Sequence, residues 1–256
     1  MGIKQFFKNF FNKYFYNPHW KCLVCGKEVF EGQSFCDDCK KQLPYNDGPI
    51  CAHCGRKIVA FENYCSTCKN VLVDLDLCRS AFSYAYPISK LIKDAKYNNS
   101  IYVIDCFAQI LSSVYFQNYF NSDYLVYIPM TEKAEKKRGY NQSKLLAQKL
   151  SEKINVPLLE CLKKVKQTER QATLGRVDRL KNLEDAFRVV DKKSVLDKSI
   201  LIVDDVTTTG ATAQVVASRL KKAGAKVVNL ITVASNLSSL FVHYSRILCG
   251  ILAPLC

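Results

Sequence analysis

The residues best suited to chemistry are two adjacent acids followed by a threonine-rich segment. Asp204 and Asp205 come directly after the apolar run 200–203, which is typical of a strand buried on both faces of a parallel sheet. Because neighbouring carboxylates repel each other, a cation, a metal ion or a polyhydroxyl ligand is the natural reason for such a pair. The residues 207–212 then lead into an expected helix over 211–223.

This segment, which we call the threonine loop, has the composition of a phosphate-binding loop. Backbone N–H groups at a helix N-terminus carry partial positive charge, threonine hydroxyls add donors, and Gly210 lets an anion approach the backbone closely. The loop has neither the Walker spacing nor the glycine pattern of a dinucleotide fold. We therefore expect a ligand with a phosphate end and a hydroxyl end. The candidate binding residues are Asp204, Asp205, Thr207, Thr208, Thr209, Gly210, Ala211 and Thr212.

Eight of the 13 cysteines form an internal repeat of two units, 22–39 and 51–68. Each unit holds two Cys-x-x-Cys turns, a spacing that directs four thiolates at one tetrahedral Zn²⁺. We expect two structural zinc sites, since four sulfurs leave no open position for catalysis, and we do not favour His53 as a replacement ligand. Sequential and crossed pairing of the turns use the same ligands, although the repeat favours sequential pairing. The ligands are Cys22, Cys25, Cys36, Cys39, Cys51, Cys54, Cys65 and Cys68.

Composition limits the class of protein. The 256 residues are 48% apolar and 23% charged, which suits one α/β domain with a small satellite and excludes wholesale disorder. The formal charge of +14 favours phosphate-rich partners without identifying one. With no signal peptide and no apolar run of about 20 residues, we expect a cytoplasmic protein whose cysteines stay reduced.

Alternating apolar segments after residue 72 predict the elements that position these residues. We expect helices near 88–96, 101–119, 139–153 and 211–223. The expected strands lie near 79–84, 124–128, 162–165, 187–190, 200–203 and 226–234. This order predicts an α/β fold, a largely parallel sheet flanked by helices, behind a small cysteine-rich zinc module.

We divide the chain into four parts. They are an N-terminal amphipathic helix at 1–19, a double zinc-ribbon-like module at 20–72, an α/β domain at 73–235, and an apolar C-terminal tail at 236–256. The first part suits a membrane surface, although packing of its Phe face on the main domain is favoured. For the tail we favour docking on the domain or on another subunit. Whether the protein forms an oligomer is therefore left open.

The run from Ile200 to Thr212 resembles the phosphoribosyl pyrophosphate motif of type I phosphoribosyltransferases. The resemblance implies that Asp204 and Asp205 are the catalytic pair that holds the ribose hydroxyls, that the threonine loop holds the 5′-phosphate, and that Mg²⁺ accompanies the ligand. Departure of pyrophosphate leaves positive charge on the sugar and needs no protein nucleophile. The pyrophosphate would lie on a second loop, for which the candidates are Pro129, Met130, Thr131 and Arg138.

The block from Arg138 to Ser143 resembles the ComF family, whose members are also called ComFC or GntX-like competence proteins. Lys96 and Tyr97 agree with that family, as do Gln171, Arg179, Asn182, Ala186 and Phe187, whereas Met130-Thr131 departs from it. The resemblance implies a role in natural competence. It also implies binding of phosphoribosyl pyrophosphate and of single-stranded DNA, and DNA-uptake partners at the inner face of the membrane.

The residues themselves leave three functions open. Lysines spread over 133–166 and aromatic residues near the cysteines are candidates for contact with single-stranded DNA. The alternatives to a DNA-uptake factor are a metabolic phosphoribosyltransferase acting on a base or an amine, and a nucleic-acid-binding regulator with phosphoribosyl pyrophosphate as effector.

Overall fold

The computed structural model describes residues 20–55, 58, 62–69, 74–97, 100–166, 185–208 and 210–235. The predicted N-terminal helix and C-terminal tail lie outside the described residues, and so do Thr209, Gln171, Arg179 and Asn182. Within the described ranges, no helix combines the length and the hydropathy needed to cross a bilayer.

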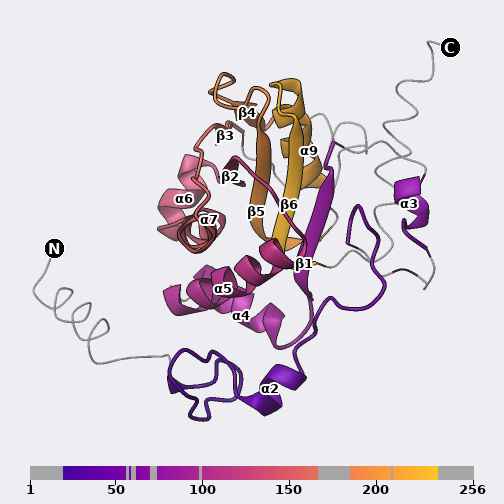
Figure 1. Cartoon of the computed structure of the whole chain (residues 1–256). Coiled ribbons are helices and arrows are strands. Elements are labelled where there is room, and N and C mark those ends of the chain that lie inside the picture. Colours follow the sequence, from indigo (N-terminus) through magenta and orange to yellow (C-terminus); the bar gives the residue numbers. More distant parts are fainter. Residues whose placement is uncertain are drawn as a thin grey trace, which may run out of the picture.

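The core of the molecule is a four-stranded parallel sheet with helices on both faces (Figure 1). Across the sheet the strands run in the order β1 (Leu77–Ser83), β6 (Val227–Ser235), β5 (Ser199–Thr207) and β2 (Tyr124–Tyr127). The predicted central strand is β5, whose residues from Ile200 to Val203 are fully buried. The predicted parallel α/β fold is therefore confirmed.

Helices α4 (Ile88–Tyr97), α5 (Ile101–Gln117) and α7 (Gln142–Ile154) cover one face, and α9 (Ala211–Lys222) covers the other. Helix α5 buries apolar side chains at helical spacing, as expected for a helix that packs on a sheet. Gly224, at φ 101°, follows the end of α9, where a left-handed residue commonly ends a helix.

The structure corrects three of the predicted elements. The helix expected at 139–153 is preceded by a separate short helix, α6 (Glu132–Arg138), because Thr131 caps its first turn and Gly139 ends it at φ 89°. Strand β5 runs four residues beyond Val203 and stays paired with β6 as far as Thr207. The short strands β3 (Leu162–Lys164) and β4 (Phe187–Val189) form a separate antiparallel pair outside the main sheet.

The two cysteine units pack against different parts of the domain. The first unit, which contains α2 (Asp37–Lys41), buries Cys22 and Phe35 in the core beneath α4 and α5. The second contains α3 (Ser66–Lys69) and lies beside Cys78, which belongs to the core on the α9 face.

The chain around the two units also covers the free edge of β1. The N–H of Asn46 donates to the carbonyl of Ala81 at 3.0 Å, and the N–H of Cys78 donates to the carbonyl of His53 at 2.7 Å. An edge strand that is paired in this way is protected from pairing with another chain.

Candidate functional site

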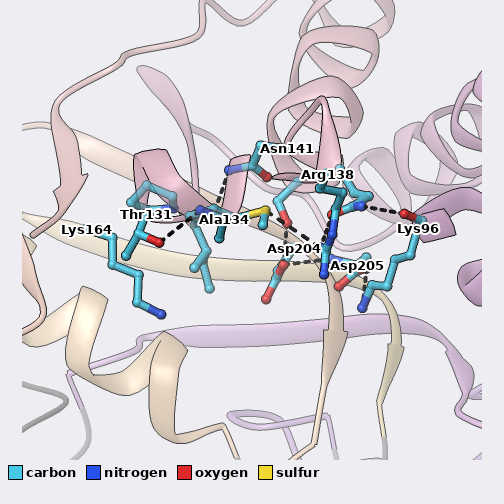
Figure 2. Close-up of a pocket in the computed structure, with 13 residues that line it drawn as sticks. Lys96, Thr131, Ala134, Arg138, Asn141, Lys164, Asp204 and Asp205 are labelled. Carbon is cyan, nitrogen blue, oxygen red and sulfur yellow. Dashed lines mark hydrogen bonds and ion pairs between the residues drawn. The ribbon is translucent and has the colours of Figure 1, made fainter. Parts of the chain in front are cut away.

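The acid pair, Asp204 and Asp205, lines one cavity of about 330 Å³ at the carboxyl ends of β2 and β5 (Figure 2). The β2–α6 loop and the turn between α6 and α7 form other parts of its wall. We call this cavity the acid-pair cavity. The structure brings together in it the acid pair and all four residues predicted for the second loop, Pro129, Met130, Thr131 and Arg138. In α/β sheets this end of the strands is where ligands bind.

The two acids have different partners. The hydroxyl of Ser143 donates to Asp204 Oδ1 at 2.6 Å, and the N–H of Asp205 donates to the same oxygen at 2.9 Å. Lys96 Nζ lies 2.7 Å from Asp205 Oδ2, and its side chain is 26% exposed. Burial, together with the charge of Asp205, raises the pKa of Asp204 from 3.8 to about 7, although the Ser143 hydrogen bond and Lys96 act in the opposite direction.

Helix α6 presents Arg138 to the cavity. Acidic residues in its first turn and basic residues in its last turn complement the helix dipole, and its N-cap Thr131 accepts from the N–H of Ala134 at 3.3 Å. Arg138 is the last residue of the helix, and its Nη1 donates to Gln142 Oε1 at 2.9 Å. A guanidinium held in this way is suited to bidentate binding of a phosphate or pyrophosphate group.

The block 138–143 fastens the walls of the cavity to one another. Gln142 Nε2 donates to the carbonyl of Lys96 at 3.2 Å, and the hydroxyl of Tyr140 donates to the carbonyl of Ala95, so both residues hold the end of α4. Asn141 Nδ2 donates to the carbonyl of Ile128 at 3.2 Å and so holds the β2–α6 loop. Gln142 therefore positions both Arg138 and Lys96.

None of the described residues of the threonine loop lines the acid-pair cavity, although the resemblance implied that one ligand would reach both the loop and the acid pair. Thr207 is buried as the last residue of β5, and Gly210 is buried at φ 74° as the N-cap of α9. Both line a second, much smaller cavity beside Cys54. Thr208 is exposed, and Ala211 and Thr212 are half-buried in the first turn of α9. The difference arises because β5 stays paired with β6 beyond the acid pair.

Some cavity residues were not predicted as site residues. Lys96 and Ser143 were noted only as part of a resemblance, and Lys164 was not singled out at all. Burial lowers the pKa of Lys164, whose Nζ lies 5.3 Å from the centre of the Phe187 ring. Lys164 is one of several lysines along 163–166, and its spacing gives no signal that separates it from them.

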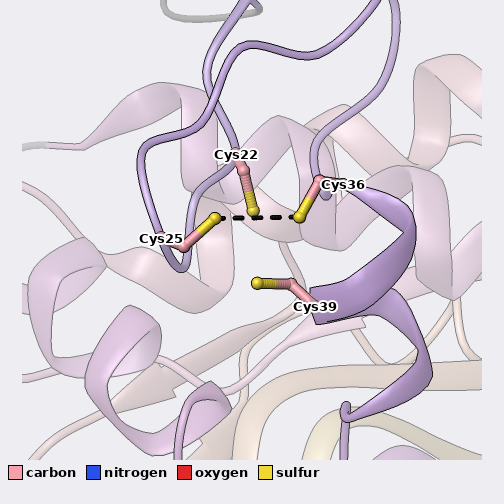
Figure 3. Close-up of side chains that lie close together, drawn as sticks. All are labelled: Cys22, Cys25, Cys36 and Cys39. Carbon is pink, nitrogen blue, oxygen red and sulfur yellow. Dashed lines mark hydrogen bonds between the residues drawn. The ribbon is translucent and has the colours of Figure 1, made fainter.

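The eight predicted cysteines form two clusters of four sulfurs, and within each cluster all the sulfurs lie within 4.8 Å of one another. Figure 3 shows the first cluster. The grouping is sequential, and it does not include His53. Cys25 Sγ and Cys36 Sγ are 3.7 Å apart, and Cys54 Sγ and Cys65 Sγ are 3.8 Å apart. Four sulfurs at about 2.3 Å around a tetrahedral Zn²⁺ would be about 3.8 Å apart, so both clusters fit structural zinc.

The first cluster also favours a thiolate. Burial opposes ionisation of Cys22, but hydrogen bonds from the N–H groups of Cys25, Cys36 and Val24 outweigh it and lower the Cys22 pKa to about 6. Thiolate is the form that binds metal. Bound zinc closes each unit into one loop and supplies structural stability rather than chemistry.

Two family models match the chain, one over the cysteine units and one over the domain that carries the acid pair. A double zinc ribbon domain matches residues 13–69, and a phosphoribosyl transferase domain matches residues 140–249. The second match includes α7, β5 with the acid pair, and α9.

Relatives with known names are similar along most of the chain. Competence protein F of Haemophilus influenzae is 29% identical over 216 residues, which are 82% of this chain and 82% of that protein. DNA utilization protein YhgH of Escherichia coli K12 is 26% identical, over 83% of this chain and 89% of its own length. Competence protein ComFC of Bacillus subtilis is 28% identical, over 57% of this chain and 58% of its own length. With a double zinc ribbon in front of a phosphoribosyl transferase domain, and with these relatives, the chain is similar over most of its length to the ComF family of competence proteins.

Proposed function

We propose that this protein binds phosphoribosyl pyrophosphate together with Mg²⁺ in the acid-pair cavity, and that it serves the handling of incoming DNA. The observation that carries the proposal is the meeting of Asp204 and Asp205 with Thr131 and Arg138 in one cavity. Carboxylates suit ribose hydroxyls and a divalent cation, whereas the hydroxyl and the guanidinium suit phosphate oxygens. One ligand that offers both kinds of group is a pyrophosphorylated sugar.

Each end of that ligand has a counterpart in the chain. The acid pair would accept hydrogen bonds from the ribose 2′- and 3′-hydroxyls, and Arg138 with the β2–α6 loop would hold the pyrophosphate. The 5′-phosphate would lie on the threonine loop, where the first turn of α9 directs N–H groups outward. Because Thr207 and Gly210 line a different cavity in this structure, binding would require the exposed part of the loop near Thr208 to move toward the acid pair.

Lys96 would change its ionic partner when the ligand binds. In this structure its ammonium neutralises Asp205. Mg²⁺ that arrives with the ligand would supply a competing cation, and the released ammonium would then face the pyrophosphate oxygens. Lys96, Lys164 and Arg138 together provide the positive charge that a pyrophosphate group needs.

Whether phosphoribosyl transfer follows binding depends on an acceptor. Among the described residues that line the cavity none is aromatic, so this part of the chain offers no stacking surface for a base. This favours a binding role over nucleotide synthesis. Release of pyrophosphate in the presence of a panel of bases and amines would instead support the metabolic alternative.

The binding proposal is tested by calorimetry with phosphoribosyl pyrophosphate and Mg²⁺. The double variant Asp204→Asn with Asp205→Asn should abolish binding while the protein keeps two zinc ions. The chain contains a matched control, because Asp37 and Asp38 are also adjacent acids but are exposed on α2. Their double substitution by Asn should leave the affinity unchanged. Equal affinity in the acid-pair variant would contradict the site.

Binding of single-stranded DNA is the second part of the proposal, and the names of the relatives support it. Exposed lysines on α6 (Lys133, Lys136, Lys137) and on the β3 hairpin (Lys163, Lys166) provide positive charge near the cavity mouth. The logarithm of the affinity should fall with the logarithm of salt concentration, by about 0.7 for each phosphate neutralised. An affinity that does not change with salt concentration would argue against DNA as the partner. DNA-uptake proteins at the inner membrane face would be further partners.

A further inference from the structure

We propose that the second cysteine unit, and not the first, supports the threonine loop, so that zinc at Cys51, Cys54, Cys65 and Cys68 and phosphoribosyl pyrophosphate strengthen each other's binding. This inference rests on the proposed function, because it assumes that the threonine loop binds the phosphate of that ligand. It assigns to one of two repeated metal sites a role beyond the folding of its own loop.

The first observation is the small cavity between the second unit and the loop. It measures about 10 Å³, which is at the lower limit for one water molecule. Cys54 lines it from the second unit, while Thr207, the last residue of β5, and Gly210, the N-cap of α9, line it from the threonine loop. A zinc ligand and these two residues are thus separated by almost no free space. A displacement of Cys54 would remove one wall from the cavity beside both of them.

The second observation is the chain that leaves the second unit. Asp74 Oδ2 accepts a hydrogen bond from Gln214 Nε2 at 3.3 Å, and Leu75 is 1% exposed within the core beneath α9. Gln214 lies in the first turn of α9, where its N–H donates to the carbonyl of Gly210 at 2.8 Å. The segment that connects the zinc site to β1 therefore contacts the start of the helix that carries the loop.

The third observation is how closely the second unit approaches β1. A Cβ atom on Gly55 would lie 2.7 Å from the carbonyl oxygen of Cys78, which is closer than such atoms come to each other. The equivalent glycine of the first unit, Gly26, has nothing within 4 Å of the same position. The two units share their ligand pattern, but at this glycine only the second is pressed against β1, whose Cys78 lines the same small cavity as Thr207 and Gly210.

These observations predict a thermodynamic coupling between zinc binding at the second unit and ligand binding at the threonine loop. A structural zinc ion supplies most of the folding energy of a loop this short, so Cys54 cannot keep its place in the wall of the small cavity after the metal is lost. If zinc favours the binding form of the threonine loop, the ligand must favour retention of zinc by the same factor. Couplings of this kind typically change affinity about 5-fold to 150-fold.

The two glycines provide a matched pair of variants for the test. Gly55 and Gly26 have φ of 69° and 75°, so an alanine at either position suffers the same backbone strain. Gly55→Ala adds a clash with β1, and Gly26→Ala does not. Both variants should retain two zinc ions. Calorimetry should show phosphoribosyl pyrophosphate bound at least about fivefold more weakly by Gly55→Ala and unchanged by Gly26→Ala.

A second measurement uses the unaltered protein, in case Gly55→Ala fails to fold. Zinc release to a chelator is followed with and without phosphoribosyl pyrophosphate and Mg²⁺. We expect the ligand to slow the release of one zinc ion of the two. If the protein binds the ligand but both ions leave at unchanged rates, and both glycine variants bind alike, the inference is wrong while the proposed function stands. If the unaltered protein does not bind the ligand, the proposed function falls and the inference falls with it.

Discussion

Replacing Asp204 by Asn should make the protein more stable and at the same time unable to bind its ligand. Asn has nearly the same shape, and its Oδ1 can still accept the hydrogen bonds from Ser143 and from the N–H of Asp205. What the substitution removes is a partly buried negative charge beside a second one. Because the pKa of Asp204 is raised to about 7 in the folded protein, ionisation of this carboxyl opposes folding.

The size of the effect follows from that pKa. A carboxyl whose pKa rises on folding contributes stability at low pH and loses it as the pH increases, here between its ordinary value of 3.8 and about 7. At about 1.36 kcal/mol per pKa unit, the cost reaches at most about 4 kcal/mol at about pH 8.5 and about 2 kcal/mol at about pH 5.5. The gain from Asp204→Asn should therefore be about 2 kcal/mol larger at the higher pH, or about 4 to 8 °C in Tm.

Thermal or denaturant unfolding of both proteins without ligand, at these two pH values, measures the difference. Both proteins keep the same zinc ligands, so loss of metal at low pH affects them equally. Asp205→Asn is the comparison variant, because it also removes the repulsion between the two acids but deprives Lys96 of the carboxylate 2.7 Å away, so it should stabilise the protein less than Asp204→Asn does. A variant Asp204→Asn that is less stable than the unaltered protein at high pH, or a gain that does not depend on pH, would refute the reasoning.

Further predictions concern the ligand and the walls of the cavity. Affinity for phosphoribosyl pyrophosphate should rise as the pH increases from about 6 to about 8, because Asp204 accepts hydrogen bonds best as a carboxylate; calorimetry across this range tests it. Arg138→Ala should weaken binding about 10-fold to 100-fold, whereas Lys133→Ala, exposed on the same helix, should not change it in the same assay. Gln142→Leu should weaken binding without loss of a cation, since it releases Arg138 and Lys96; an unchanged affinity would show that neither needs positioning.

The sequence predicted those parts of the site that depend on local pattern. An apolar run such as 200–203 has few alternatives to a buried strand, and acids at its end must lie at the edge of the sheet where ligands bind. The repeat predicted the sequential clusters of sulfurs, because Cys-x-x-Cys turns fix the distance between ligands locally. The Thr131 cap and Gly139 were visible signals for α6, but the basic residues between them were interpreted as candidates for phosphate and DNA contact and not as a helix.

The rest depends on tertiary contacts that local pattern does not specify. Nothing near Lys96 in the sequence shows that Gln142 and Tyr140 will hold the end of its helix against Asp205. The length of β5 was underestimated because its extension is determined by pairing with β6, which lies later in the chain. That extension is also why Thr207 and Gly210 line a different cavity from the acid pair.

The zinc module shows how a repeat that is symmetric in sequence becomes asymmetric in a structure. Zinc constrains only the ligands and the turns that carry them, so the outer surfaces of the two units are free to differ. The first unit buries Cys22 with Phe35 beneath α4 and α5, and the second places Cys54 against the base of the threonine loop. Between them the chain pairs with β1, an edge strand that would otherwise expose its hydrogen-bonding groups. Two small metal sites joined in this way hold the chain along the edge of β1 from Cys78 to Ser83, a length that a single unit of this size could not cover.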